Sequence, residues 1–120
     1  MIYDQSPISW RYSLFPIQEG HNESICLEET VRIALDKLDA YENTRDYALL
    51  GEIPHWAHIL KVNQSEKGVW HKYVNGRTGE PMGDEKTLAP VKLFIRLRGI
   101  MNSSEYDHAI SLAHEYSNHL

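Results

Sequence analysis

The most regular hydrophobic pattern of the chain lies between residues 23 and 42. Apolar side chains recur there at steps of three and four residues, which is the spacing of one face of an α-helix. They are Leu27, Val31, Ala34, Leu35, Leu38 and Tyr41. Asn22 precedes this stretch and can cap its first turn. The pattern predicts a helix over residues 23–42, with Cys26 buried on it and with Glu28 and Arg32 spaced to pair.

A different period appears near the start of the chain. Over residues 8–15, apolar and polar side chains alternate, and Pro7 and Pro16 stand on either side. The apolar positions are Ile8, Trp10, Tyr12 and Leu14. Strict alternation places one set of side chains on each face of a strand. Residues 8–15 are therefore predicted to form a strand with one buried face.

The middle of the chain holds two apolar runs, 56–62 and 69–74, on either side of the polar segment 63–68. Two such runs around a polar turn that ends in glycine are typical of a β-hairpin. The pair Asn75 and Gly76 is a second turn signal and closes the second strand. Before the hairpin, the pattern over residues 43–54 is ambiguous, and residues 47–50 fit a helical turn that ends at Gly51.

The stretch 90–98 fits two structures. Its leucine, valine and isoleucine residues take every second position, as in a strand, and alternate with Lys92, Phe94, Arg96 and Arg98. A helical stripe is also present, made of Leu88, Val91, Phe94, Ile95 and Met101. The leucine content favours the helix, with Thr87 as its cap, Pro90 in its first turn and Gly99 at its end. A last helix is predicted after Ser103 or Ser104. Its apolar face comprises Tyr106, Ala109, Ile110, Ala113 and Tyr116.

These elements predict an α+β fold. A small antiparallel sheet, made of the N-terminal strand and the central hairpin, would pack against two or three helices. The chain has 120 residues, of which 42% are hydrophobic and 24% charged. This is enough for one globular domain with its own core, so residues 1–120 are expected to form a single domain.

Composition also indicates the compartment. No window approaches 18 consecutive apolar residues, so we expect no membrane partner. The first residues lack the basic and apolar regions of a secretory signal, and the single cysteine, Cys26, has no second thiol to pair with. We therefore expect a cytoplasmic protein. No sequence pattern indicates an oligomeric state.

Charge is distributed unevenly along the chain. The net charge is about −5 over residues 1–50, about +3 over 51–100 and about −3 over 101–120, which together make the formal −5. A polarised surface of this kind is typical of a protein that meets a charged partner.

Motifs for catalysis or metal binding are absent from the sequence. His55 and His58 lie three residues apart. On the predicted strand they would face opposite sides and would not share a metal, whereas on a helix they would. No serine lies in a Gly-x-Ser-x-Gly context. The Gly-x-x-Gly segment from Gly76 to Gly79 lacks the Gly-Lys-Ser/Thr that ends a phosphate-binding loop. We expect no metal site and no cofactor, and we favour a binding protein over an enzyme.

Two binding surfaces are predicted. The first is an acidic face of the 23–42 helix, which would bind a protein partner that carries basic groups. A protein of this size and charge would act as an inhibitor, immunity protein or antitoxin does. Its residues are Glu29, Asp36, Asp39 and Glu42. The alternative is a basic aromatic hairpin that would bind or process nucleic acid. Its residues are Trp56, Lys61, Trp70, Lys72, Tyr73 and Arg77. Trp70 fits either the core or an exposed stacking platform, and the core is favoured.

Overall fold

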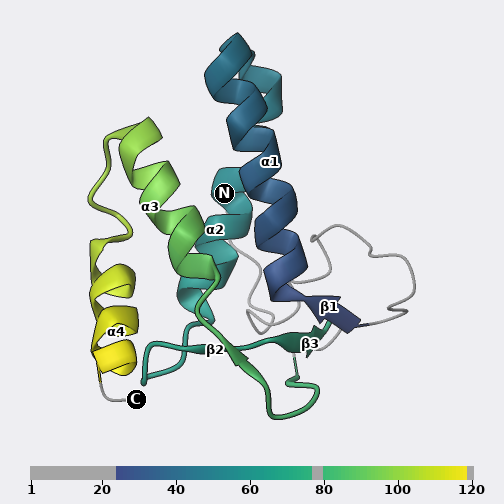
Figure 1. The fold of residues 1–120 in the computed structure, drawn as a ribbon, viewed down its shortest axis with the longest axis vertical. Helices are drawn as coiled ribbons and strands as arrows, with labels where there is room; N and C mark the ends of the chain where they lie inside the picture. The colour runs from purple at the N-terminus through teal and green to yellow at the C-terminus, as the bar shows by residue number, and fades with distance from the viewer. Residues whose placement is uncertain (1–23, 77–79, 119–120) are drawn as a thin grey trace, which may run out of the picture.

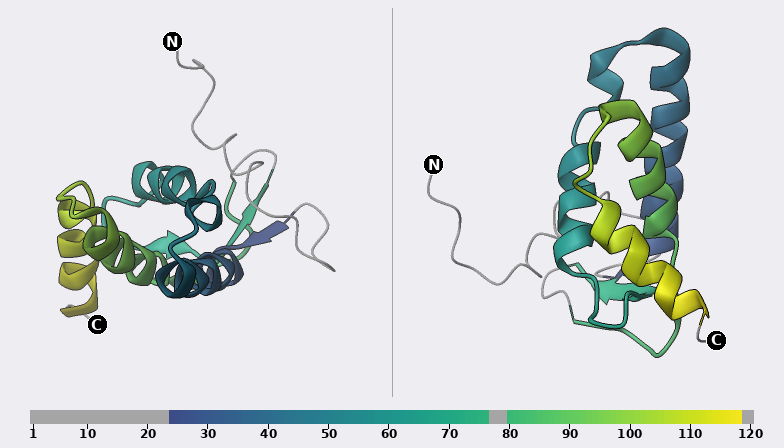
Figure 2. Two further views of the ribbon diagram at one scale, coloured as in Figure 1. Left: turned by 90° about the horizontal axis from the view of Figure 1, so that it is seen from above. Right: turned by 90° about the vertical axis from the view of Figure 1, so that its left-hand side faces the viewer.

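The computed structural model describes residues 24–76 and 80–118 of the chain. Its helices are α1 (Leu27–Thr44), α2 (Ile53–Val62), α3 (Pro90–Met101) and α4 (Asp107–Asn118), and the 3₁₀ turn η2 (Tyr47–Leu49) lies between α1 and α2. Its strands are β1 (Ser24–Cys26), β2 (Trp70–His71), β3 (Tyr73–Asn75) and β4 (Lys86–Thr87). Helices α1, α2 and α3 stand side by side above the strands, and α4 lies against α3 (Figures 1 and 2). The predicted α+β class, with a small antiparallel sheet packed on helices, is confirmed.

The segment that carries β2 and β3 is the centre of the strand layer. β2 pairs antiparallel with β4, so that Trp70 lies opposite Thr87, and β3 pairs antiparallel with β1. Between them, the Lys72 N–H donates to the Glu85 carbonyl and the Lys72 carbonyl accepts from the Leu27 N–H, both at 2.8 Å. The first backbone N–H of α1 is thus satisfied by the strand layer, which anchors the helix to it.

The predicted central hairpin is wrong. The run 56–62 lies in α2, and the run 69–74 pairs with β1 and β4. Ile53, Trp56, Ala57 and Leu60 are buried at helical spacing, and Pro54 lies in the first turn, where its missing N–H costs little. A short apolar run does not distinguish a helix from a strand by its period. In this protein the core covers the face that residues 53–62 present as a helix.

The helix predicted over residues 23–42 begins later and ends later. Ser24–Cys26 form β1, because their backbone pairs with β3 and Ile25 lies opposite Val74. Cys26 is buried, as predicted, but it lies in β1 and at the N-cap position of α1. The Cys26 side chain makes no cap hydrogen bond. The expected apolar stripe of α1 is confirmed, with Leu35 half-buried and its other members buried. Asn22 and the predicted strand 8–15 lie outside the described residues.

Helix α3 occupies the middle of the bundle and packs against α1, α2 and α4. The helical interpretation of residues 90–98 is therefore confirmed, with Pro90 in the first turn. Gly99 does not end the helix, which continues to Met101 and stops at Asn102 in the left-handed conformation. The cap position is Ala89 rather than Thr87. The buried face of α3 comprises Pro90, Val91, Leu93, Phe94 and Leu97.

An aromatic row joins the strand layer to the last helix. Trp70 lies 5.8 Å from Phe94 between ring centroids, and Phe94 stacks on Tyr106 at 5.2 Å. Tyr106 immediately precedes α4, which begins at Asp107, after the predicted cap residues Ser103 and Ser104. The predicted apolar face of this helix is confirmed, since all of its members are buried except the half-buried Tyr116.

Candidate functional site

The exposed side of α1 carries one line of charged side chains. Glu29, Arg32, Asp36 and Asp39 follow each other at steps of three, four and three residues, which keeps them on one side of the helix. Glu42 comes three residues later. The structure therefore places the four carboxylates predicted as an acidic face on one exposed surface, where the side chains of Asp36 and Asp39 are 64% and 63% accessible.

Two arginines lie within this acidic face. Arg32 bonds Glu29 on one side and Asp36 on the other, the latter at 2.9 Å, instead of the Glu28 that its spacing predicted. The hydrogen bond and charge of Glu29 raise the pKa of Arg32, with a smaller contribution from Asp36. This first triad is built within α1 alone.

The second triad joins two helices. Arg96 of α3 reaches Glu42 at 2.8 Å and Asp39 at 2.9 Å. The hydrogen bond to Glu42 raises the pKa of Arg96, and Asp39 adds to this, although burial opposes it. In each triad one guanidinium serves two carboxylates. Each triad therefore retains a net charge of about −1, and the whole face a net charge of about −2.

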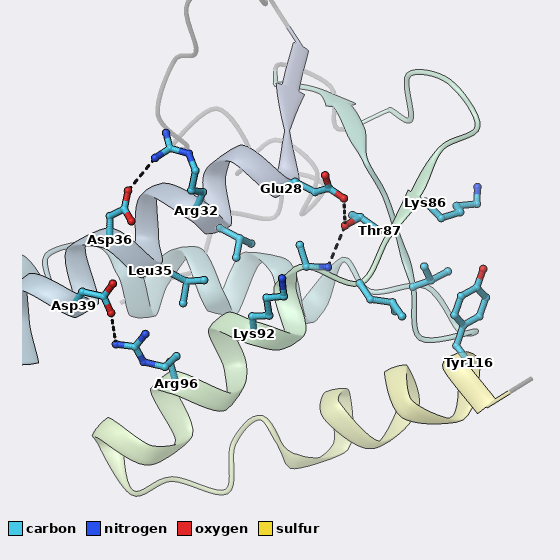
Figure 3. A pocket seen from close by; sticks show the side chains of 14 residues that line it. Glu28, Arg32, Leu35, Asp36, Asp39, Lys86, Thr87, Lys92, Arg96 and Tyr116 are labelled. Carbon is cyan, nitrogen blue, oxygen red and sulfur yellow. Dashed lines mark hydrogen bonds and ion pairs between the residues drawn. The ribbon is translucent and has the colours of Figure 1, made fainter. Parts of the chain in front are cut away.

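A groove of about 870 Å³ lies beside this face, between α1 and α3 (Figure 3). Its apolar part is formed by Val31, Leu35, Val69 and Leu88. Near one end, Arg96 crosses from α3 to Asp39; nearer the strands, the Thr87 hydroxyl bonds the Glu28 carboxylate. Lys92 lies between these two crossings (Figure 3). Apolar lining surrounded by polar side chains is the usual make-up of a ligand site.

The predicted stacking platform is not exposed. Trp56 is 4% accessible and Trp70 is 3% accessible, which confirms the core interpretation of Trp70. The Trp70 indole Nε1–H donates to the Leu60 carbonyl at 2.8 Å, and Lys37 Nζ lies 5.3 Å from the centre of the Trp56 ring. Neither indole face is available for stacking on a nucleic-acid base.

The basic residues predicted to form one hairpin surface lie on different elements. Lys61 of α2 pairs with Glu105 at 3.2 Å. Lys72 pairs with Glu85 at 3.4 Å and Glu28 at 3.7 Å, and its Nζ lies 5.3 Å from the centre of the half-buried Tyr73 ring.

Tyr73, Glu28 and Glu85 raise the pKa of Lys72. Carboxylates therefore neutralise two of the lysines in the predicted basic surface. Arg77, its remaining basic member, lies outside the described residues.

The described histidines lie on three elements, α2, β2 and α4. His55 and His58 lie on α2 rather than on a strand, and the half-buried His71 lies in β2. Within residues 24–76 and 80–118, no group of three His, Cys, Asp or Glu side chains could hold a metal ion. His71 instead contacts Lys86, whose Nζ lies 3.2 Å from the ring nitrogen Nδ1.

Sequence reasoning missed the groove because its walls come from separate parts of the chain. Lys86, Lys92 and Arg96 line it from β4 and α3, and Tyr116 lines it from α4. One signal was available: Lys92 and Arg96 lie four residues apart in a predicted helix, so they share a face. That this face meets the acidic side of α1 depends on how the helices pack.

None of the helices in the described part of the chain is both long enough and apolar enough to span a membrane. Comparisons with protein-family models, with curated proteins and with solved structures find no significant match to this chain.

Proposed function

We propose that this chain is a non-enzymatic protein-binding module, and that the acidic face of α1 docks on a basic surface of a protein partner. The observation that carries the proposal is the pair of carboxylate–arginine–carboxylate triads. They fix four carboxylates in one line, of which Glu29 is half-buried and the other three are exposed, and they leave a net negative charge on it. Side chains that are already held in place lose less conformational entropy when a partner binds.

The charge of the face supports a basic partner. Opposite charges at the edge of an interface mainly increase the association rate and the selectivity for the right partner, while buried contacts supply affinity. The groove beside the face has apolar walls at Leu35 and Val31, where an apolar side chain of the partner can enter. The face and the groove together combine electrostatic steering with an apolar anchor.

The type of module proposed is an inhibitor of the immunity-protein or antitoxin kind. This rests on the small size of the chain, its net charge of −5 and its α1 face. Its compartment would be the cytoplasm, since the single cysteine is buried and in the thiol form.

The test is affinity capture from the native host with matched baits. The first variant, Asp36→Asn with Asp39→Asn, removes two charges from the face at nearly constant shape. The control, Glu66→Gln with Asp84→Asn, removes two exposed carboxylates elsewhere. A partner that binds through the face should be retained by the wild type and the control and be lost or strongly reduced with the first variant.

The captured protein is then purified and its association rate measured at two salt concentrations. We expect the rate to fall with salt for the wild type and to be lower and less salt-dependent for the face variant. Recovery of no stoichiometric protein, or equal binding by both variants, would contradict the proposal. Circular dichroism of each bait separates a loss of binding from a loss of folding.

A further inference from the structure

The described basic side chains of this acidic protein divide into three groups. Five of those described have a carboxylate within 3.4 Å: Arg32, Lys61, Lys72, Arg96 and Arg98. Lys37 and Arg45 instead lie over the rings of Trp56 and Tyr41. Among the described residues, Lys67, Lys86 and Lys92 have neither an acidic partner nor a tryptophan or tyrosine ring beneath them. Three uncompensated cations in a chain with a net charge of −5 require an explanation.

These three lysines lie along two adjoining hollows. Lys92 and Lys86 line the groove of about 870 Å³, and Lys86 and Lys67 line a neighbouring hollow of about 360 Å³. The two hollows share Lys86 and Val69 in their linings, so they adjoin at these residues and together make up one lysine-lined depression. In Figure 3, Lys92 lies in the middle of the groove and Lys86 at its strand end, with Tyr116 rising from α4 towards that end.

The carboxylates in the larger groove are already engaged. Asp36 is held by Arg32 and Asp39 by Arg96, while Glu28 accepts from the Thr87 hydroxyl at 3.0 Å. In the smaller hollow, Glu66 is the carboxylate that lines it, and it is exposed. Four basic and three acidic side chains line the larger groove, so its lining has a net charge of about +1. The excess comes from Lys86 and Lys92, which pair with none of these carboxylates.

We propose that this depression binds a small molecule with several negative charges, of the oligophosphate or polycarboxylate class, through Lys67, Lys86 and Lys92. A lysine ammonium binds phosphate and carboxylate groups as a point charge with three donors. Because Lys67 and Lys92 lie in different hollows on either side of the shared Lys86, a ligand with charges along its length can meet all three. The larger groove alone, at about 870 Å³, has the size of a site for a small organic ligand, for which pockets of about 300–1,000 Å³ are usual.

Other side chains give the ligand a place for its uncharged part. Val69 and Leu88 offer apolar contact, and Tyr116 offers a ring and a hydroxyl. At the junction of the two hollows, the His71 ring contacts Lys86 Nζ at 3.2 Å and so restrains the shared lysine. The groove borders the acidic face and shares Asp36 and Asp39 with it, but the lysines of the proposed site come from the turn before β2, from β4 and from α3. The lysines therefore favour ligands of the opposite charge.

The test is a titration of the full chain with inorganic tripolyphosphate and, separately, with citrate. Binding is followed by amide shifts in ¹H–¹⁵N NMR spectra and by calorimetry at low salt. Both probes are expected to shift residues around Lys86, Lys92 and Tyr116. Their relative affinities distinguish a phosphate ligand from a carboxylate ligand.

Two matched double variants decide whether the lysines are responsible. Lys86→Met with Lys92→Met should weaken binding of the better probe by about tenfold or more, since a charged hydrogen bond contributes about one factor of ten or more. Lys37→Met with Arg45→Met removes the same charge elsewhere and should change affinity by less than about threefold, the effect of net charge alone. Both pairs of residues are without acidic partners in the described structure, so neither variant leaves a buried carboxylate uncompensated.

The proposal is overturned if neither probe binds at millimolar concentration, or if the two double variants lose affinity equally. It is also overturned if a single-stranded oligonucleotide binds at this site while both small anions do not. The Asp36→Asn, Asp39→Asn variant should keep the anion site. Failure of the anion site therefore leaves the protein-binding proposal intact, and the reverse also holds.

Discussion

Thr87 donates its hydroxyl to the Glu28 carboxylate at 3.0 Å and joins β4 to the first turn of α1, across 59 positions of the sequence. The same oxygen accepts the Ala89 N–H at 3.0 Å, just before α3 begins. Thr87 is buried, so one side chain connects a strand and two helices beside the groove. The contact holds the groove's strand end in place.

Thr87→Val should therefore destabilise the fold. Valine keeps the volume but leaves the part-buried Ala89 N–H without its acceptor and the Glu28 carboxylate without its donor. The loss of these two hydrogen bonds is expected to cost about 1–3 kcal/mol. Urea unfolding measures the loss. Thr44→Val, at an exposed hydroxyl near the end of α1, should cost less. Equal losses would contradict the role given to Thr87.

Gly68 allows α4 to approach the turn before β2. A Cβ at Gly68 would lie 2.3 Å from the Leu112 carbonyl oxygen, and the residue has φ +93. Gly68→Ala should cost about 3 kcal/mol or more, because backbone must move on both sides. Gly83→Ala is the matched control: its φ is +96, but a Cβ there meets open space. The control should show only the cost of an unfavourable φ, about 1–2 kcal/mol. If thermal or urea unfolding gives equal losses, the close approach to Leu112 is not the cause.

Tyr106 should make the protein sensitive to alkali. Burial, and to a smaller extent the charge of Glu105, raise the pKa of Tyr106 to about 12. An unfolded tyrosine loses its proton near pH 10, so above that pH the unfolded state binds fewer protons than the folded state. The contribution of the neutral phenol is complete below about pH 10 and falls as pH rises from 10 to 12.

Tyr106→Phe isolates this effect. Relative to its value at pH 8, the wild type should lose up to about 3 kcal/mol more unfolding free energy than the variant by pH 12, since each pKa unit is worth about 1.4 kcal/mol. Urea unfolding of both proteins across this range gives the difference. Parallel pH profiles would show that Tyr106 ionises as easily when folded as when unfolded.

The indole N–H of Trp70 should exchange slowly with solvent. It is buried and donates to the Leu60 carbonyl at 2.8 Å, which ties β2 to the last turn of α2. Exchange followed by NMR should then require global unfolding rather than local fraying. Trp70→Phe should cost about 1–3 kcal/mol, because the Leu60 carbonyl loses its donor. Rapid exchange in the folded protein would place this hydrogen bond in doubt.

Helices with a repeating apolar stripe were predictable from the chain. The stripe of α1 and the apolar face of α4 are written in steps of three and four residues, and the structure buries them as expected. For α3, the leucines rightly favoured the helix over the strand. These patterns are local, and a helix satisfies its own backbone hydrogen bonds, so no distant partner needs to be known.

Strand pairing was not predictable in the same way. Residues 56–62 and 69–74 looked like the two arms of one hairpin, yet β3 pairs with β1, about fifty residues earlier, and β2 with β4. A strand takes its hydrogen bonds from another segment, and short apolar runs do not identify that segment. β1 has only three residues and directly precedes α1, so the helical pattern concealed it.

The charge pattern was likewise determined only in part. The sequence by itself determines which residues are acidic and that Glu29, Asp36, Asp39 and Glu42 share a side of one helix. Only the tertiary structure brings Arg96 to Asp39 and Glu42, neutralises Lys61 and Lys72, and leaves Lys86 and Lys92 without acidic partners along the groove. The physical reason is range: side-chain periodicity acts over one or two turns, whereas an ion pair or a groove depends on packing between elements that are distant in the chain.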